Sequence, residues 1–224
     1  MKKYIYAVTL LVLSACDARL DQMKPHNMSD ADTYLKKFEN IVNATSGLYA
    51  QFYAQTGGFT YDYVYEAVYH VLGEFRGNNM IFAEAFEDKN LALGGPDAYF
   101  YLYSDQKAQS FAWPMWARTN QIILGASKNI QAIEKLESED IMQVKPEKLQ
   151  RLKGESYFIR GLFTFNSLNV FGRPYWDEPD KNPGIPLDTL GSGELLPRSS
   201  VKDCFNSIIR DFTRAASCLP DKPI

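Results

Sequence analysis

The chain has 224 residues, 46% of them hydrophobic, and a formal net charge of −3 from 24 basic and 27 acidic side chains. This hydrophobic content is typical of a globular protein, and the length suffices for one large domain with a sizeable buried core. The basic residues are scattered among acidic ones rather than gathered in a patch, which argues against a nucleic-acid-binding protein.

The N-terminus has the layout of a bacterial lipoprotein signal. Two lysines are followed by a run of about ten apolar residues, which is the length of a signal segment and about half of what crosses a bilayer. Small residues, Ser14 and Ala15, then precede Cys16. We therefore expect a signal peptide over residues 1–15, lipidation of Cys16, and an anchor linker over residues 16–28. An ordinary secretory signal that happens to contain a cysteine is the alternative.

The first predicted helix runs from Ser29 to Gln55, where apolar side chains recur at helical spacing on one face. Ser29 and Asp32, three residues apart, resemble a capping box. The pair Gly57-Gly58 should end the helix.

Between Phe59 and Tyr103 the helical pattern gives way to aromatic-rich pieces separated by glycines. Long ordered loops in a compact domain are more often functional than accidental. We therefore expect long aromatic-rich loops here, with one short helix over residues 66–75.

Two prolines mark the starts of two further helices. Pro114 suits the first turn of a helix whose apolar stripe ends near Leu136, and Pro146 opens the next helix. That next helix should end at Gly172, because Pro174 follows shortly and cannot continue it.

The stretch from residue 173 to residue 198 contains five prolines and three glycines, which predicts a crossover loop without regular structure. A fourth helix is predicted from Ser199 or Ser200 to Leu219, just before Pro220. The middle helices share a short turn and the last is set off by a long loop. We therefore predict an all-α fold of tetratricopeptide-like helical repeats rather than a tight bundle.

Two cysteines, Cys204 and Cys218, fall on this fourth helix. The helical rise separates them by roughly 21 Å, whereas a disulfide tolerates about 7 Å between Cα atoms. An internal disulfide is therefore excluded if the helix forms.

Groups that could carry catalysis are few. His26 and His70 lack spacing partners for a zinc site or a catalytic triad, and carboxylate pairs such as Glu84 with Glu87 are better explained as solvated surface. No nucleophile-elbow, zinc-protease or phosphate-loop motif occurs in the sequence. We expect no catalytic residue, metal or cofactor, and a carbohydrate-active enzyme is the weakest of our hypotheses.

After the lipoprotein signal, six motifs follow one another along the chain: Gly47–Tyr49, Arg118–Ile123, Lys153–Phe165, Asn169–Pro174, Pro183–Leu187 and Arg198–Val201. In this order they resemble the SusD/RagB family of outer-membrane nutrient-binding lipoproteins. Members of that family are much longer, so the resemblance indicates the N-terminal helical part of a SusD-like protein over residues 29–224. The helix from Ser199 to Leu219 also carries a wide apolar stripe that no following helix in this sequence would cover.

The resemblance implies a lipoprotein held in the outer membrane by lipid on Cys16 and exposed at the cell surface. Such a protein would bind an oligosaccharide, less often a peptide, and pass it to a SusC-like TonB-dependent transporter. The alternative is a tetratricopeptide-like module that binds a partner protein and no small ligand.

A glycan binder needs exposed rings for the C–H faces of sugars and polar groups for their hydroxyls. The aromatic-rich loops supply both kinds of residue. The candidates are Phe59, Tyr61, Tyr63, Tyr99 and Tyr101, with Arg76, Asn78 and Asn79 nearby in sequence. The simpler interpretation is that most of these rings pack against the helical core.

Overall fold

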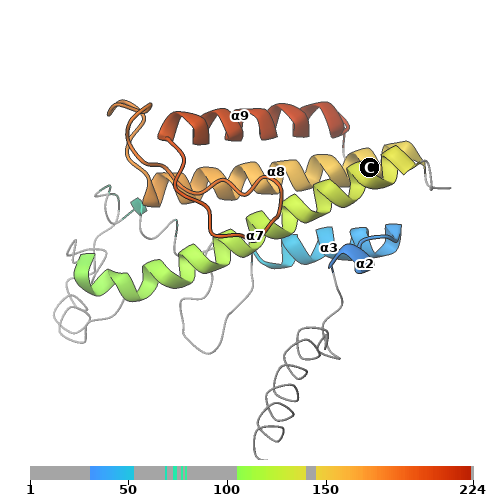
Figure 1. Cartoon of the computed structure of the whole chain (residues 1–224), viewed down its shortest axis with the longest axis horizontal. Coiled ribbons are helices and arrows are strands. Elements are labelled where there is room, and N and C mark those ends of the chain that lie inside the picture. The colour runs from blue at the N-terminus through green and yellow to red at the C-terminus, as the bar shows by residue number, and fades with distance from the viewer. Residues whose placement is uncertain are drawn as a thin grey trace, which may run out of the picture. The chain divides into compact units, whose positions relative to one another are not determined.

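The computed structural model describes residues 31–52, 69, 73–74, 77, 79, 105–139 and 145–222. The chain divides into two compact units, Met1–Tyr34 and Leu35–Ile224. In the first unit the described residues form one helical turn, α2 (Ala31–Tyr34). The described part of the second unit consists of helices joined by turns and loops (Figure 1): α3 (Phe38–Ala50), α7 (Asp105–Glu139), α8 (Pro146–Phe171) and α9 (Val201–Cys218). The all-α prediction is confirmed, while the tetratricopeptide-like character of the repeats stays a prediction.

Helix α8 is the centre of the second unit. It lies between α7 and α9, and α3 packs against both α7 and α8 (Figure 1). Two glycines let α9 approach closely. A Cβ atom on Gly154 would lie 2.8 Å from Cγ of Leu219, and one on Gly161 would lie 3.2 Å from Cε1 of Phe212. A larger residue at either position would push the two helices apart.

The helix predicted from Ser29 to Gln55 is not continuous, so this prediction was wrong in its extent. Residues 35–37 leave the helical conformation, and α3 restarts at Phe38 after an extended Lys37. In an unbroken helix the side chains of Leu35 and Ile41 would point about 120° apart around the axis. The break allows both to enter one buried cluster. The expected cap at Ser29 and the stop at Gly57-Gly58 lie outside the described residues.

Helix α7 begins at Asp105, so the prediction that Pro114 opens it was wrong. A proline inside a helix removes one backbone hydrogen bond and costs about 3 kcal/mol. Burial along one face of the following turns offsets this cost, because Met115 is 3% exposed and Thr119, one turn further on, is fully buried. The predicted apolar stripe is confirmed over its second half, where Ile123, Ala126, Ile130 and Ile133 are all buried.

The bounds predicted for the last two helices are confirmed. Helix α8 starts at Pro146, and the backbone N–H of Gly172 donates to the Leu168 carbonyl (2.8 Å) where the helix ends. Helix α9 is capped by Ser200, whose hydroxyl oxygen accepts a hydrogen bond from the Asp203 backbone N–H. Such a cap satisfies a donor that the helix itself leaves free.

The crossover from residue 173 to residue 198 has no regular element, as predicted, and closes with an isolated antiparallel bridge between Pro183 and Ser200. Cys204 and Cys218 lie on α9 as free thiols. No described helix combines the length and the apolar composition of a membrane span.

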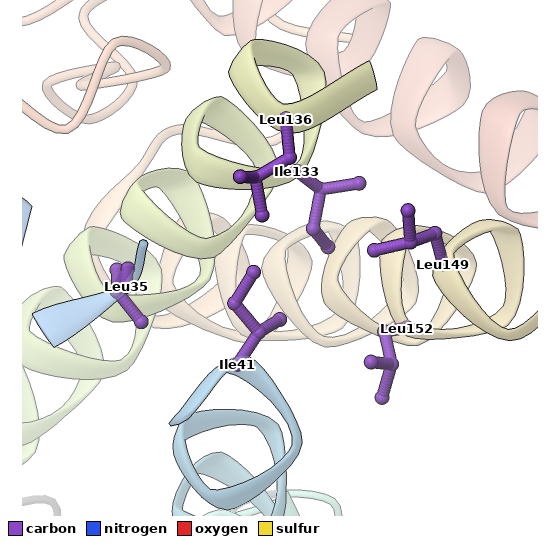
Figure 2. Packing of buried hydrophobic residues seen from close by; sticks show 6 residues of the cluster. All are labelled: Leu35, Ile41, Ile133, Leu136, Leu149 and Leu152. Carbon is purple, nitrogen blue, oxygen red and sulfur yellow. The ribbon is translucent and has the colours of Figure 1, made fainter. Parts of the chain in front are cut away.

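The core runs along the seams between α3, α7, α8 and α9. One cluster, shown in Figure 2, joins Leu35, Ile41, Ile133, Leu136, Leu149 and Leu152. A second, further along the same helices, joins Leu48, Ile122, Ile123, Ala126, Ile159 and Phe163. Each buried Leu, Ile or Phe side chain stabilises the fold by about 1.5–3 kcal/mol relative to an exposed one. These seams fix the helices on which the candidate sites lie.

Candidate functional site

Most of the residues predicted to bind a ligand or a lipid lie outside the described part of the chain, so these assignments stay predictions. They are Cys16, Phe59, Tyr61, Tyr63, Arg76, Asn78, Tyr99 and Tyr101. The remaining one, Asn79, is exposed, and its backbone N–H donates to the Glu74 carbonyl (2.9 Å).

One described contact ties this part of the chain to the core. The hydroxyls of Tyr69 and Thr119 lie 2.9 Å apart, and Thr119 is fully buried on α7. Burial raises the pKa of Tyr69 to about 12. The phenol therefore stays neutral at any physiological pH, and this attachment to α7 does not titrate.

A buried polar node holds the crossover loop against the helices. Arg160 on α8 donates to both carboxylate oxygens of Asp211 on α9, from Nε and Nη2, at 2.7 Å each. Its Nη1 donates to the Thr189 carbonyl (3.0 Å) and to the Ser127 hydroxyl (3.3 Å), and Ser127 donates to the Asp188 carbonyl (2.9 Å). The node thus joins α7, α8, α9 and the loop.

The sequence analysis did not find this node, because its members are far apart along the chain and no motif joins them. Both charged side chains are only 5% exposed. Charges so deeply buried persist only when they are paired and hydrogen-bonded, as these are. The node therefore acts as a structural clamp.

Asp188 organises the next turn of the same loop. Burial raises the pKa of its carboxyl, but the backbone N–H groups of Gly193 and Ser192, which donate to it at 2.7 and 2.9 Å, bring that pKa below its usual value. Gly193 and Gly191 have φ of +71° and +61°, which glycine adopts without strain. The loop is thus held in one conformation on the helices.

A cavity next to the node is too small for an organic ligand. Its volume is about 10 Å³, and its polar lining includes Arg160, Thr164, Asp188, Ser207 and Asp211. That space holds at most one water molecule.

The first surface feature is a row of apolar side chains along the outside of α8 and α9, which we call the outer apolar row. It consists of Phe158, Phe165, Phe205, Ile209 and Phe212. The rings of Phe158 and Phe212 lie 6.0 Å apart and those of Phe165 and Phe205 lie 6.4 Å apart. Ile209 is 60% exposed. The apolar stripe predicted on the fourth helix is present, but the expectation that it lies uncovered was wrong, because it packs against α8. Val201, Ile208 and Ala215 are buried and Phe205, Phe212 and Leu219 are half-buried, while the exposed Ile209 lies beside the stripe.

The second surface feature is a turn that follows α8, which we call the Tyr175–Trp176 turn. The backbone N–H of Asp177 donates to the Pro174 carbonyl (3.1 Å) and closes the turn. Trp176 is 85% exposed, and Tyr175 is 50% exposed with its ring edge-on to Phe205, the centroids 5.0 Å apart. The sequence analysis treated this stretch only as a crossover loop. Two adjacent rings directly after a proline were the signal that could have marked it.

Side-chain hydrogen bonds fix this turn to its neighbours. Arg173 donates from Nε (3.0 Å) and Nη2 (2.7 Å) to one carboxylate oxygen of Asp177. The side-chain amide of Asn182 donates to the Asp177 carbonyl (2.6 Å). The rings are therefore presented on a braced segment, although each bond is at the surface and contributes modestly to stability.

Three acid–base pairs surround the turn along the chain: Arg173 with Asp177, Lys181 with Glu178, and Lys202 with Asp180, each with a closest contact of 2.6–2.7 Å. The hydrogen bond and the charge of Asp180 raise the pKa of Lys202. Each of the three positive side chains is paired with one negative side chain, so the charges of the six side chains cancel. The turn thus offers polar groups without a net charge.

No group of three His, Cys, Asp or Glu side chains in the described ranges could hold a metal ion. The described surface provides rings, paired charges and amides, which are the groups of a binding surface.

Comparisons with known proteins agree with this architecture. Residues 20–224 match the SusD-like family, described as starch-binding and associating with the outer membrane. A SusD superfamily structure from Bacteroides vulgatus ATCC 8482 has a TM-score of 0.62 at 23% identity, covering 83% of this chain and 38% of that one. One from Bacteroides thetaiotaomicron VPI-5482 has a TM-score of 0.61 at 22% identity, covering 81% and 37%. No curated protein matches the chain. The solved structures share the fold, and this chain spans less than two fifths of the length of either.

Proposed function

Because the chain belongs to the SusD-like family, we propose that it is a cell-surface lipoprotein that binds an oligosaccharide, or less often a peptide. It delivers this nutrient to a SusC-like TonB-dependent transporter in the outer membrane. The observation that carries the proposal is the family match over residues 20–224. Exposed rings next to hydrogen-bonding side chains, as on the Tyr175–Trp176 turn, support it, because sugars are bound by such pairs of groups.

The proposal includes the anchor. Residues 1–15 are the signal peptide, Cys16 carries the lipid, residues 16–28 are the linker, and residues 29–224 are the N-terminal helical part of a SusD-like protein. Support comes from the charged start, the short apolar run and the small residues before the cysteine. Several acyl chains on one residue give stable anchoring, whereas one chain binds reversibly.

Mass spectrometry of the mature N-terminus tests the anchor. The expected result is a chain that begins at Cys16 with diacylglyceryl and acyl groups, and release of the Cys16→Ser variant from the membrane fraction. An unmodified thiol at a mature N-terminus would contradict lipid anchoring.

We further propose that the protein binds its nutrient without transforming it. The description of the SusD-like family names starch binding and no reaction. Incubation of the full chain with each oligosaccharide that it binds should yield no new reducing ends. Hydrolysis that disappears in a single Glu or Asp variant would contradict this part of the proposal.

Calorimetric titration tests binding itself. The full chain, solubilised in detergent, is titrated with a panel of oligosaccharides that includes maltoheptaose, and with a panel of peptides. The expected result is saturable heat with at least one oligosaccharide, weakened by Tyr61→Ala or Tyr101→Ala. No heat with any oligosaccharide, from a sample whose circular dichroism is helical, would contradict the proposal.

A second candidate is the tetratricopeptide-like module that binds a partner protein and no small ligand. The outer apolar row favours it, because monomeric proteins rarely leave several large apolar side chains together in water unless they mark an interaction site. Capture from detergent-solubilised outer membranes separates the two candidates. The first expects a TonB-dependent transporter together with oligosaccharide binding. The second expects a protein partner whose capture is lost in Ile209→Ser, with no heat in the titrations.

A further inference from the structure

We propose that the Tyr175–Trp176 turn is a stacking subsite for one pyranose ring of an uncharged oligosaccharide. This inference rests on the proposed function and adds to it a site on residues outside the aromatic-rich loops of the sequence prediction. The indole of Trp176 would lie under the C–H face of the sugar, and Tyr175 would contact the neighbouring ring of the same chain.

Exposure is the first argument. Trp176 is 85% exposed, more than any other aromatic side chain in the described part of the chain. Tryptophan is highly buried on average, because its ring removes a large apolar area from water. No ring contact reaches Trp176 within the described residues, whereas Tyr175 has one edge against Phe205. One side chain of the turn is thus anchored to α9, and the other presents its faces to solvent.

Rigidity is the second argument. The backbone bond from Asp177 to Pro174, the pair between Arg173 and Asp177, and the amide bond from Asn182 all meet at Asp177 and hold the backbone of the turn. A ligand that binds on a backbone already ordered loses less conformational entropy than one that must order a loop. The turn is therefore preorganised to receive a flat ligand face.

Charge distinguishes a sugar from other ligands. The three carboxylates of the turn are each paired with one of three cations, so the site has no net charge to attract a phosphate or a charged peptide end. Paired carboxylates and ammonium groups still have hydrogen-bonding capacity toward sugar hydroxyls. Rings flanked by neutralised polar groups thus fit an uncharged carbohydrate.

The same charges argue against a protein interface at this turn. The side chains of Lys181 and Glu178 are 75% and 62% exposed, directly after the exposed indole in the sequence. The core of a protein interface is depleted in Lys, Glu and Asp. The outer apolar row, in which Phe158, Phe165 and Ile209 are exposed, is the surface with interface composition. The Tyr175–Trp176 turn therefore suits a sugar, and the outer apolar row suits a protein partner.

Titration of Trp176→Ala against the wild-type full chain in detergent tests the inference, with maltoheptaose and the other oligosaccharides of the panel as probes. We expect the variant to bind about tenfold more weakly or worse, and Trp176→Phe to retain part of the affinity. Leu195→Ala, at a fully exposed position of the same crossover, is the matched control and should bind like wild type. Circular dichroism checks that all variants fold.

Tryptophan fluorescence gives a second readout. The sequence contains three tryptophans, and a ligand that stacks on Trp176 should change the emission of the wild type but not that of Trp176→Phe. If the wild type binds and Trp176→Ala binds equally well, the subsite is overturned while the proposed function stands. If the wild type binds no oligosaccharide, both are overturned. If Trp176→Ala keeps its glycan affinity but loses transporter capture, the turn is a protein contact and the subsite is overturned.

Discussion

The inner and outer faces of α8 differ in how completely their side chains are buried and paired. On the inner face, Arg160 makes four hydrogen bonds with α7, α9 and the crossover loop. On the outer face, Phe158 and Phe165 remain more than a third exposed. One helix thus carries a surface that determines the fold and a surface available for recognition.

The two faces differ because one is buried against other helices and the other is in contact with water. A buried polar group without a partner is costly, so the inner face tolerates little change. Exposed apolar side chains lose stabilisation but are free to contact another molecule. Mutations should therefore separate the faces, with large stability effects inside and small ones outside.

The largest effect is expected from breaking the buried node. Asp211→Ala leaves the guanidinium of Arg160 buried without its anion, which should lower the free energy of unfolding by about 3–5 kcal/mol. Urea unfolding followed by circular dichroism measures it. Asp180→Ala, which breaks the exposed pair with Lys202, is the control and should leave the free energy of unfolding nearly unchanged, because water and salt screen surface pairs. Equal losses in the two variants would show that the inner face has no special role.

A smaller effect is expected from the glycines. Gly154→Ala places a methyl group 2.8 Å from Cγ of Leu219 and should destabilise the protein by about 1–3 kcal/mol. Gly47→Ala, in α3 with no atom of the described residues within 4 Å of its new Cβ, should stabilise it by about 0.5–1 kcal/mol. The two midpoints of urea unfolding should therefore move in opposite directions. A shift of both midpoints in the same direction would contradict the close packing of α8 and α9.

Acid should reveal a weaker contribution from Asp188. Its pKa is lower in the folded chain than the ordinary value of 3.8, so its stabilising effect is present above that value and is lost as pH falls toward the folded pKa. Unfolding measured between pH 5 and pH 2, on the order of the range where Asp titrates, should show a shallower acid loss in Asp188→Asn than in wild type. Superimposable pH profiles would indicate that its hydrogen bonds to Ser192 and Gly193 do not stabilise the loop.

The smallest effect on stability is expected from the outer face. Ile209→Ser should change the free energy of unfolding by no more than about 0.5 kcal/mol, because the side chain is 60% exposed. If the outer apolar row mediates association between copies of the chain, the same change should reduce self-association in analytical ultracentrifugation. A loss of several kcal/mol would mean that the outer apolar row belongs to the core.

Local signals predicted the second half of the fold well. Pro146, the glycine stop at Gly172 and the Ser200 cap with Asp203 act over a few residues, and the bounds of α8 and α9 follow from them. The break before α3 and the start of α7 could not be read in this way. They depend on Leu35 meeting Ile41 and on the packing that offsets Pro114, which are tertiary effects.

Sequence reasoning was weaker for the surface. Arg160 and Asp211 stand 51 positions apart, and only the folded chain brings them together. Trp176 is exposed because of a turn inside a proline-rich stretch. The composition of that stretch predicts an irregular loop, but it does not show which side chains of the loop point into solvent. The apolar stripe of α9 was predictable from its amphipathic pattern. Its cover was not, because the sequence does not show that the preceding helix α8 buries Val201, Ile208 and Ala215.

The most direct test of the central claim, that the chain captures an oligosaccharide at the cell surface, uses intact bacteria producing it. Cells are incubated with a fluorescent maltooligosaccharide, washed and measured. The account predicts retention above cells with an empty vector, loss of that retention with Cys16→Ser, and reduction with Trp176→Ala. Retention equal to the empty vector, with the full-length protein detected at the surface by antibody, would contradict it.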